Sequence, residues 1–441
     1  MIETIDLAVS AKYVLPMENK TVLSDAGVAI KGEDIIYVGP TKQLLERFKP
    51  LKYLSYKEGL ILPGLINGHT HIAMTLFRGL ADDLPLMEWL NEYIFPLEQN
   101  LRPEWVYLGA LLGCAEMIVS GTTCFCDMYL FSDMVAQAAA KAGLRAIVGE
   151  VLYDFPSPNY GPLEKGFIYT EKLIKKWKSH PLISVAVMPH AVYTCSPPLL
   201  KQAKEIADSY KVPYVIHLAE TKTEIKQIKG KYGCTSIEYL EKLGILNENL
   251  IAVHCVWPTE KEIELLKRHQ VKVIHNPESN LKLGSGIAPI PKLLRKGIIV
   301  GLGTDGPASN NDLDMFLEMG TAARIHKFYQ NDPTTMTAWQ TLKMATKDGA
   351  CALGISEIGS LSPGKKADLI VVNLDRPHLM PIYEPISNLV YAASGSDVVT
   401  NIVNGKILME NKKILTIDLE KLYEEINAIA LNIKKQMGFK L

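Results

Sequence analysis

Five residues with metal-binding side chains end apolar stretches in the middle of the chain. His69 and His71 belong to the sequence His-Thr-His, and on an extended chain residues two positions apart project to the same side. His217, His254 and Asp305 each end a later stretch. Three imidazoles with one carboxylate are a donor set that suits zinc, and iron and manganese also fit. The sequence therefore predicts a metal site.

Each of these residues taken alone is a weak indication. A His-x-His sequence occurs by chance, His254 could be a satisfied core histidine, and Asp305 could form a turn. What favours a site is that each residue falls at the end of a predicted strand, and Glu220 lies three residues after His217. In a barrel of parallel strands the chemistry collects at the strands' C-terminal ends.

The elements that must position these residues follow a regular order. Short β-branched stretches alternate with segments of helical spacing, such as residues 103–120, where Pro103 suits a first turn, and 260–268, where Thr259 is an expected N-cap. Near-continuous apolar strands separated by helices indicate a parallel sheet, and eight such units favour a (β/α)8 barrel, hence an α/β fold. The predicted strands are 59–69, 121–129, 144–153, 183–190, 212–220, 249–257, 271–279 and 297–305.

The two ends of the chain differ from the middle. Residues 1–58 and 364–415 alternate in the manner of strands and are expected to form one small β-sandwich domain. Residues 59–363 are expected to form the catalytic barrel, and 416–441 an amphipathic C-terminal helix.

The stretch GLGTDGPASNN at 301–311 contains the glycine spacing of a dinucleotide-binding turn. Such a turn needs a helix that begins within the glycines, so that its N-terminus meets the pyrophosphate. Pro307 and the following ASNN interrupt that pattern, and the next helical pattern begins near Asp312. The glycines are therefore expected to let the chain pass closely beside the metal site.

Composition restricts the partners and the compartment. The 441 residues carry a formal net charge of −1 without a block of like charge, which disfavours nucleic acid as a partner. No apolar run of about 18 residues and no signal peptide is evident, so no membrane association is expected. The seven cysteines have no C-x-x-C spacing. Cys124 and Cys126 are predicted to be buried and to pack as small hydrophobic residues. A cytoplasmic protein is predicted.

Several motifs resemble a known family. LPGLINGHTH, HLAET, HNPESNLKLGSGIAPI, LGTDGPASNN and GSLSPGKKADLIVV together resemble the amidohydrolase superfamily and, within it, the 5′-methylthioadenosine/S-adenosylhomocysteine deaminases. The resemblance runs from the first strands to about residue 415. It implies zinc-dependent hydrolytic deamination of adenine nucleosides (5′-methylthioadenosine, S-adenosylhomocysteine or adenosine) and an assembly of identical subunits, each with one zinc.

The resemblance also implies roles for individual residues. His69, His71, His217 and Asp305 would hold the zinc, Glu220 would shuttle protons to and from the purine, and His254 would hydrogen-bond the zinc-bound water. Ser309 would help to orient Asp305, Glu98 would bind the ribose hydroxyls, and His190 would contact substrate. Alternatively, Glu98 could be an exposed glutamate on the surface of a helix. His275 is expected to have a structural role.

One position departs from the family. Glu150 stands where some members carry an arginine expected to meet the amino-acid carboxylate of S-adenosylhomocysteine. A glutamate in contact with that carboxylate would repel it, which would favour the neutral thioether nucleoside or adenosine.

Other enzyme activities and a non-catalytic role are alternatives to nucleoside deamination. Guanine deaminase, cytosine deaminase and triazine chlorohydrolase share the metal ligands, and Glu98 separates them because a carboxylate for ribose hydroxyls suits only nucleosides. A non-catalytic scaffold is disfavoured because the ligands and Glu220 are all present. Strand four ends in VAVMPH without the lysine that bridges two metals in binuclear barrels, so a single metal is favoured.

Overall fold

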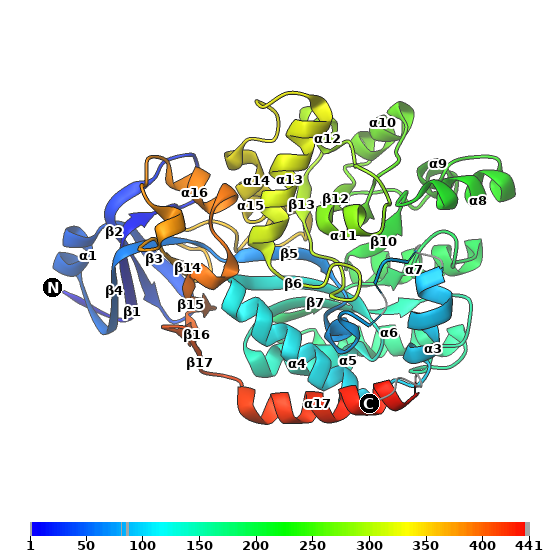
Figure 1. The fold of residues 1–441 in the computed structure, drawn as a ribbon, viewed down its shortest axis with the longest axis horizontal. Coiled ribbons are helices and arrows are strands. Elements are labelled where there is room, and N and C mark those ends of the chain that lie inside the picture. Colours follow the sequence, from blue (N-terminus) through cyan, green and yellow to red (C-terminus); the bar gives the residue numbers. More distant parts are fainter. Residues whose placement is uncertain (1, 81, 85–87, 437–441) are drawn as a thin grey trace.

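Eight parallel strands alternate with helices along the middle of the chain (Figure 1). The computed structural model describes residues 2–80, 82–84 and 88–436. The strands are β5 (Leu65–Thr70), β6 (Thr122–Tyr129), β7 (Arg145–Leu152), β8 (Ile183–Val185) with its continuation β9 (Met188–Pro189), β10 (Tyr214–Leu218), β11 (Leu250–His254), β12 (Lys272–His275) and β13 (Val300–Leu302). Seven predicted barrel strands are confirmed, and the eighth, predicted over 59–69, is present over Leu65–Thr70.

The strands close into a ring in the order in which they occur in the chain. Hydrogen-bonded pairing runs from β5 to β8 and from β10 to β13, and bridges such as Val187–Tyr214 join the two groups. The ring closes between the last and first strands, where the Asp305 amide donates to the His69 carbonyl at 3.0 Å. Beside this bond, Asn67 and Thr304 exchange two hydrogen bonds of 2.7 and 3.0 Å.

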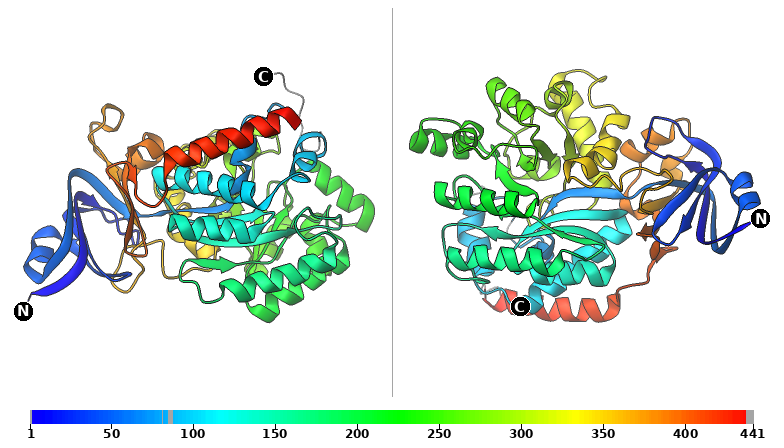
Figure 2. Two further views of the ribbon diagram at one scale, coloured as in Figure 1. Left: turned by 90° about the horizontal axis from the view of Figure 1, so that it is seen from below. Right: turned by 180° about the vertical axis from the view of Figure 1, so that it is seen from behind.

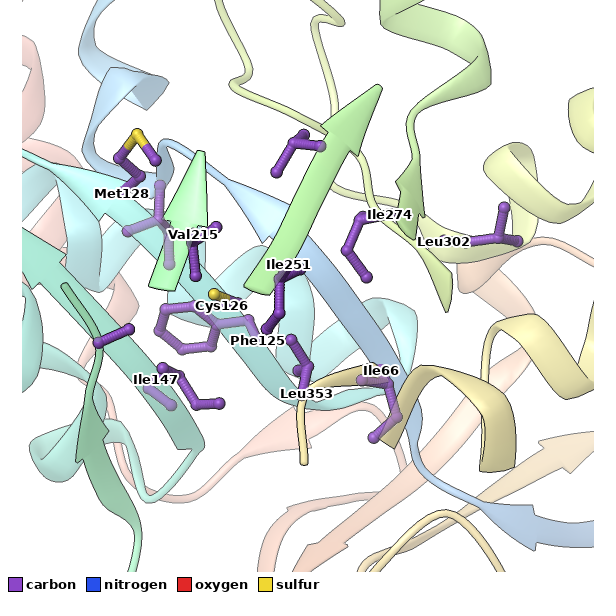
Figure 3. Packing of buried hydrophobic residues seen from close by; sticks show 14 of the residues in the cluster. Ile66, Phe125, Cys126, Met128, Ile147, Val215, Ile251, Ile274, Leu302 and Leu353 are labelled. Carbon is purple, nitrogen blue, oxygen red and sulfur yellow. The ribbon is translucent and has the colours of Figure 1, made fainter. Parts of the chain in front are cut away.

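Apolar side chains fill the inside of the ring. Figure 3 shows residues of β6 and β7, such as Phe125 and Ile147, close to Val215 of β10 and Ile251 of β11. All four belong to one buried cluster. Cys124 and Cys126 are also fully buried, and burial raises the pKa of Cys124 to about 12, so both cysteines pack as small hydrophobic groups as predicted.

The helices begin where the sequence predicts. α4 has a proline in its first turn and ends at Gly121, whose φ of 93° is the left-handed conformation that glycine adopts at low cost. α10 is capped by Thr259, which forms a reciprocal capping box with Glu262. The α-helices are α1 (Thr41–Arg47), α3 (Phe95–Glu98), α4 (Pro103–Ser120), α5 (Ser132–Ala142), α6 (Leu163–Trp177), α7 (Pro197–Tyr210), α8 (Lys222–Tyr232), α9 (Ser236–Lys242), α10 (Glu260–Arg268), α11 (Pro277–Lys282), α12 (Ile290–Arg295), α13 (Met315–Gln330), α14 (Ala338–Met344), α15 (Lys347–Ala352), α16 (Pro385–Tyr391) and α17 (Leu419–Gln436). A 3-10 helix η1 (Ile72–Phe77) and a π-helix η2 (Trp89–Ile94) follow β5.

The two ends of the chain share a single eight-stranded sheet, mostly antiparallel, with a core of its own. Its order is β17 (Lys413–Ile414), β16 (Lys406–Glu410), β15 (Val398–Val403), β14 (Leu369–Asn373), β4 (Phe48–Pro63), β1 (Glu3–Val14), β2 (Leu23–Lys31) and β3 (Asp34–Pro40). The strand expected over 59–69 is divided, because 59–63 pair with β14 and the barrel strand begins at Leu65. The expected border between 58 and 59 therefore falls inside β4, and the domain limits remain a prediction.

The C-terminal helix α17 lies along α4 on the outside of the barrel (Figure 2). Its buried residues Leu422, Ile429 and Ile433 share one face of an amphipathic helix. The last five residues of the predicted C-terminal segment, 437–441, lie outside the described residues. Among the helices that the structure describes, none has the length and apolarity needed to cross a membrane.

A buried ion pair joins the barrel to the terminal sheet. Arg145, the first residue of β7, donates from Nε and Nη2 to the two carboxylate oxygens of Asp368 at 2.9 and 3.2 Å. Arg145 is 6% and Asp368 2% exposed. Asp368 also accepts a hydrogen bond from the Asn404 amide at 2.7 Å, so the pair ties β7 to the loops that flank β14 and β15.

Replacing this arginine by an apolar residue should destabilise the chain strongly. Arg145→Met leaves the Asp368 carboxylate buried without a countercharge, and we expect the free energy of unfolding in urea to fall by about 3–5 kcal/mol. Lys12→Met breaks the exposed Lys12–Glu58 pair and should lower the free energy of unfolding far less, because solvent screens that pair. Similar losses for the two variants would contradict a structural role for the buried pair.

Candidate metal centre and active site

Three histidines meet at the C-terminal end of the barrel. His69 and His71 come from the end of β5 and His217 from β10, and their candidate ligand atoms lie within 4.8 Å of one another. The Nε2 atoms of His69 and His217 are 3.1 Å apart. This donor set fits a zinc ion, because facing imidazole nitrogens at such distances are held together by a shared cation.

Backbone carbonyls orient two of the three rings. Nδ1 of His217 donates to the His190 carbonyl at 2.8 Å, and Nδ1 of His71 donates to the Met128 carbonyl. A carbonyl only accepts, so each bond places a ring proton on Nδ1 and makes Nε2 the nitrogen directed at the centre. Both rings are therefore held ready to bind a metal.

Asp305 completes the set from the end of β13. Its Oδ1 lies 3.5 Å from Nε2 of His69 and 3.2 Å from Nε2 of His71. Its Oδ2 accepts a hydrogen bond of 2.6 Å from the Ser279 hydroxyl. The prediction that Ser309 orients Asp305 is wrong, because the Ser309 hydroxyl donates to the Gly306 carbonyl and Ser279 binds Asp305 instead.

The protonation of the site follows from burial and from these contacts. Burial lowers the pKa of His69 to about 4 and holds that of His217 well below its usual range, so both rings are neutral. Burial opposes charge on His71 and Asp305 too, but their mutual attraction outweighs it: the pKa of His71 rises to about 9, and that of Asp305 falls well below its usual range. A metal that binds here displaces the His71 proton.

Glu220 and His254 face each other beside the histidines. Oε2 of Glu220 lies 3.9 Å from Nε2 of His254, and its Oε1 accepts a hydrogen bond of 3.2 Å from the Ser285 hydroxyl. Burial raises the pKa of Glu220. A carboxyl group with a raised pKa next to a cavity is suited to donate and recover a proton.

The backbone adopts strained conformations at three positions where the chain leaves barrel strands. Ala219, His254 and Asp305 have φ angles of 53°, 73° and 63°, in the left-handed region that costs a non-glycine residue about 1–2 kcal/mol. These residues follow or end β10, β11 and β13. The surrounding structure bears this cost because the turn aims the neighbouring polar side chains into the site.

The glycines at 301–306 allow a close passage, as predicted. A Cβ atom on Gly303 would lie 2.6 Å from the His69 amide nitrogen, and one on Gly306 would lie 3.1 Å from the His71 side chain. α13 begins only at Met315, so no helix N-terminus lies within the glycine pattern. The dinucleotide-binding interpretation is thereby excluded.

Two adjoining cavities open onto the centre, and His71, Trp89, Leu90 and His190 line both. The first, with an empty volume of about 380 Å³, is lined further by His217, Glu220, His254 and Asp305. The second, of about 450 Å³, is lined mainly by apolar and aromatic residues, with Glu98 at its wall. The cavities thus place His190, Glu98, Glu220 and His254 around the histidines and Asp305.

Glu150 does not lie beside the substrate cavity, where the family resemblance had implied that it would be. Its side chain is fully buried at the end of β7 and accepts hydrogen bonds from the Ser132 amide at 2.9 Å, the Phe131 amide at 3.3 Å and the Asn159 side chain at 2.9 Å. It lines neither cavity. The expected repulsion of a substrate carboxylate by Glu150 is therefore wrong, and this glutamate instead holds the start of α5.

Three polar residues of the site were not assigned from the sequence. Ser279, Asn280 and Ser285 lie in the stretch NPESNLKLGSG after β12 and contact Asp305, His254 and Glu220 respectively. Their signal in the sequence is weak, because serine and asparagine after a strand are also what a turn requires. His275, expected to be structural, is buried and pairs with His326 at 3.0 Å.

Comparisons with known proteins agree with this geometry. Residues 60–408 match the model of the Amidohydrolase family. A 5-methylthioadenosine/S-adenosylhomocysteine deaminase of Syntrophobacter fumaroxidans is 55% identical over 408 residues, 92% of this chain and 93% of the relative. A protein called 5-methylthioadenosine/S-adenosylhomocysteine deaminase 1 of Syntrophus aciditrophicus is 48% identical over 438 residues, 99% of each chain.

A solved structure with bound zinc has a similar fold. The crystal structure of an adenosine deaminase from Xanthomonas campestris with bound zinc has a TM-score of 0.97 and 40% identity, and covers 99% of this chain and 100% of that one. Similarity therefore extends over nearly the whole length in sequence and in fold. The chain belongs to the amidohydrolase family and, within it, to the group of the 5-methylthioadenosine/S-adenosylhomocysteine deaminases.

Proposed function

We propose that the protein is a zinc-dependent deaminase that converts adenine nucleosides, 5′-methylthioadenosine above all, to the inosyl products and ammonia. The observation that carries the proposal is the joint placement of a metal-ligand set, an acid–base pair and Glu98 around two connected cavities. The names of the similar proteins support the same reaction.

His69, His71, His217 and Asp305 would hold the zinc, which supplies an acidified water at neutral pH. Asp305 would accept a proton from the water that attacks C6 of the purine. Glu220, whose pKa burial raises, would donate a proton to N1 and so localise the charge that develops on the ring. His254 accepts a hydrogen bond from the attacking water and fixes its direction. Ammonia leaves with a proton relayed from these groups.

Glu98 supports a nucleoside substrate over a free base. It ends α3 and lines the apolar cavity, whereas Glu220 and His254 line the other one. A carboxylate in this place can accept hydrogen bonds from the two ribose hydroxyls, whereas a free guanine or cytosine offers it no such donors. His190 lines both cavities, where it would contact the nucleoside between its base and its sugar.

The apolar cavity also supports a preference among nucleosides. None of the described residues that line it is lysine or arginine, and aromatic and aliphatic side chains such as Trp89, Phe95 and Tyr153 predominate. A methylthio group gains from such walls, whereas the carboxylate of a homocysteine group would lose water without gaining a cation.

Two further expectations remain predictions. All seven cysteines are free, and six of them are buried, which supports a reducing cytoplasm as the site of action. The association of identical subunits is expected from the family resemblance.

Substrate choice tests the proposed function directly. We expect zinc-loaded protein to release ammonia from 5′-methylthioadenosine, S-adenosylhomocysteine and adenosine and not from guanine or cytosine. The absent cation should make kcat/KM for 5′-methylthioadenosine exceed that for S-adenosylhomocysteine by about ten- to a hundredfold. Release from a free base alone would contradict the nucleoside assignment, and equal rates would contradict the specificity argument.

Loss of the acid at Glu220 should stop turnover without loss of the metal. In Glu220→Gln we expect kcat to fall by about 10²–10⁴-fold, because glutamine cannot donate a proton to N1. Zinc content, measured by elemental analysis, should remain at one per chain. Glu264→Gln, which alters an exposed glutamate on α10, is the matched control and should keep full activity. A nearly normal kcat in Glu220→Gln would remove this residue from the mechanism.

The affinity for substrate should depend on pH through Glu98. Burial raises the pKa of this carboxyl to about 7, so it becomes protonated as the pH falls from 8 to 6 and loses its strength as an acceptor. We expect KM for 5′-methylthioadenosine to rise over this range. Glu98→Gln should raise KM about ten- to a hundredfold at pH 8 and abolish this pH dependence. An unchanged pH profile in that variant would show that another group titrates.

A further inference from the structure

One short segment contacts all three residues that handle protons in the proposed reaction. Residues 279–285 follow β12 and include the second half of α11. Ser279, Asn280 and Ser285 are 0%, 1% and 5% exposed. Their side chains bond to Asp305, His254 and Glu220 in turn, although these three groups come from three different strands or strand ends.

The contact between Asn280 and His254 determines which ring nitrogen carries the proton. Nδ1 of His254 lies 2.9 Å from Oδ1 of Asn280. With the amide in this orientation its oxygen accepts, and the ring donates from Nδ1. Nε2 then keeps its lone pair and faces the cavity and the carboxyl group of Glu220. In this tautomer His254 can accept a hydrogen bond from a water in the cavity.

The two serines act in the same way on the two carboxyl groups. Ser279 donates to Oδ2 of Asp305 at 2.6 Å, which leaves Oδ1 directed at the histidine ligands. Ser285 donates to Oε1 of Glu220 at 3.2 Å, which leaves Oε2 directed at His254. In both cases one oxygen is held by the segment and the other faces the reacting groups.

The segment is itself fixed in place. The Ser285 amide donates to the Asn280 carbonyl at 2.9 Å, and the Trp257 indole donates to the Ser285 carbonyl at 2.7 Å. Gly286 follows with a φ of 126°, and a Cβ atom there would lie 2.6 Å from the Trp257 ring. The close approach that this glycine permits lets the chain turn tightly against the indole, so the polar groups of the segment have little freedom to move.

We propose that residues 279–285 are a positioning segment that orients the proton-handling groups together, and that Asn280 sets the tautomer of His254. The inference deepens the proposed function and rests on it, since the roles of His254, Glu220 and Asp305 in deamination are part of that function. Ser279, Asn280 and Ser285 do not line the cavity and act through Asp305, His254 and Glu220, so they are positioning residues and not catalytic ones.

The tautomer can be read without substrate. In zinc-loaded wild-type protein labelled with 15N-histidine, we expect ring correlations that place the proton of His254 on Nδ1; the His254→Gln variant assigns the signal. In Asn280→Leu the acceptor is lost, and the proton should move wholly or partly to Nε2. A wild-type ring protonated on Nε2, or a ring unaffected by Asn280→Leu, would overturn the assignment whether or not the protein deaminates nucleosides.

Kinetics then measure what the tautomer contributes. For 5′-methylthioadenosine we expect Asn280→Leu to lower kcat about 10–100-fold while KM changes by less than about threefold and zinc content stays the same. Asn280→Asp keeps an acceptor for Nδ1 and should retain both the Nδ1 proton and a kcat within about tenfold of wild type. If Asn280→Leu does not fold, Asn280→Ala takes its place. A normal kcat in a folded variant with a shifted tautomer would refute the positioning role.

A matched control separates positioning from general stability. Asn401→Leu removes another buried amide, which donates to the Ile118 and Thr122 carbonyls near the terminal sheet. It should lower the thermal midpoint while leaving kcat and the His254 ring signal unchanged. An equal loss of kcat in this variant would mean that the effect of Asn280→Leu reflects destabilisation alone.

The two serine variants should differ from each other. Ser279→Ala removes the hydrogen bond to Oδ2 of Asp305, whose Oδ1 faces the histidine ligands. We expect this variant to bind zinc about tenfold more weakly, measured by competition with a chelator. Ser285→Ala should leave zinc affinity unchanged and lower kcat about tenfold. Variants that leave both zinc affinity and kcat at wild-type values would contradict the role of the segment as a whole.

Discussion

The structure depends on holding several imidazole nitrogens and a carboxylate together at one buried point. Lone pairs that face one another out of water repel, and a carboxylate removed from water carries a large desolvation cost. A shared cation removes both penalties, which is why the arrangement makes sense only as a metal centre. The backbone carbonyls behind His71 and His217 and the left-handed turn at Asp305 serve to keep this otherwise unfavourable arrangement in place.

The barrel supplies this convergence because its parallel strands all end on one face. Ligands from β5, β10 and β13 meet there without any one loop having to carry the whole site. The segment after β12 adds hydrogen bonds from behind, and the residues before α4 add the apolar wall and Glu98. The terminal sheet attaches at the opposite end, through Arg145 at the start of β7, and so stabilises the scaffold without entering the site.

The sequence allowed the barrel and the cluster of His69, His71 and His217 to be predicted, because strand periodicity and strand-end residue types are local signals. Three features could not be predicted in this way. The apolar run 59–69 passes from one sheet to another at Gly64, and composition does not change there. Glu150 was misplaced because a position in a strand does not reveal which groups surround its side chain. Asn280 and the two serines looked like ordinary turn residues, since their partners lie in other strands.

The seam between β5 and β13 has a consequence for biosynthesis. It joins residues at opposite ends of the barrel sequence, such as Asn67 and Thr304, which are 237 residues apart. On a ribosome that adds about 5–20 residues per second, roughly 12–50 seconds separate the synthesis of His71 from that of Asp305. Until Asp305 has been added, the nascent chain lacks one of the four residues of the ligand set, and residues 306–441 still remain to be added afterwards. The metal centre is therefore among the later parts of the barrel that can form.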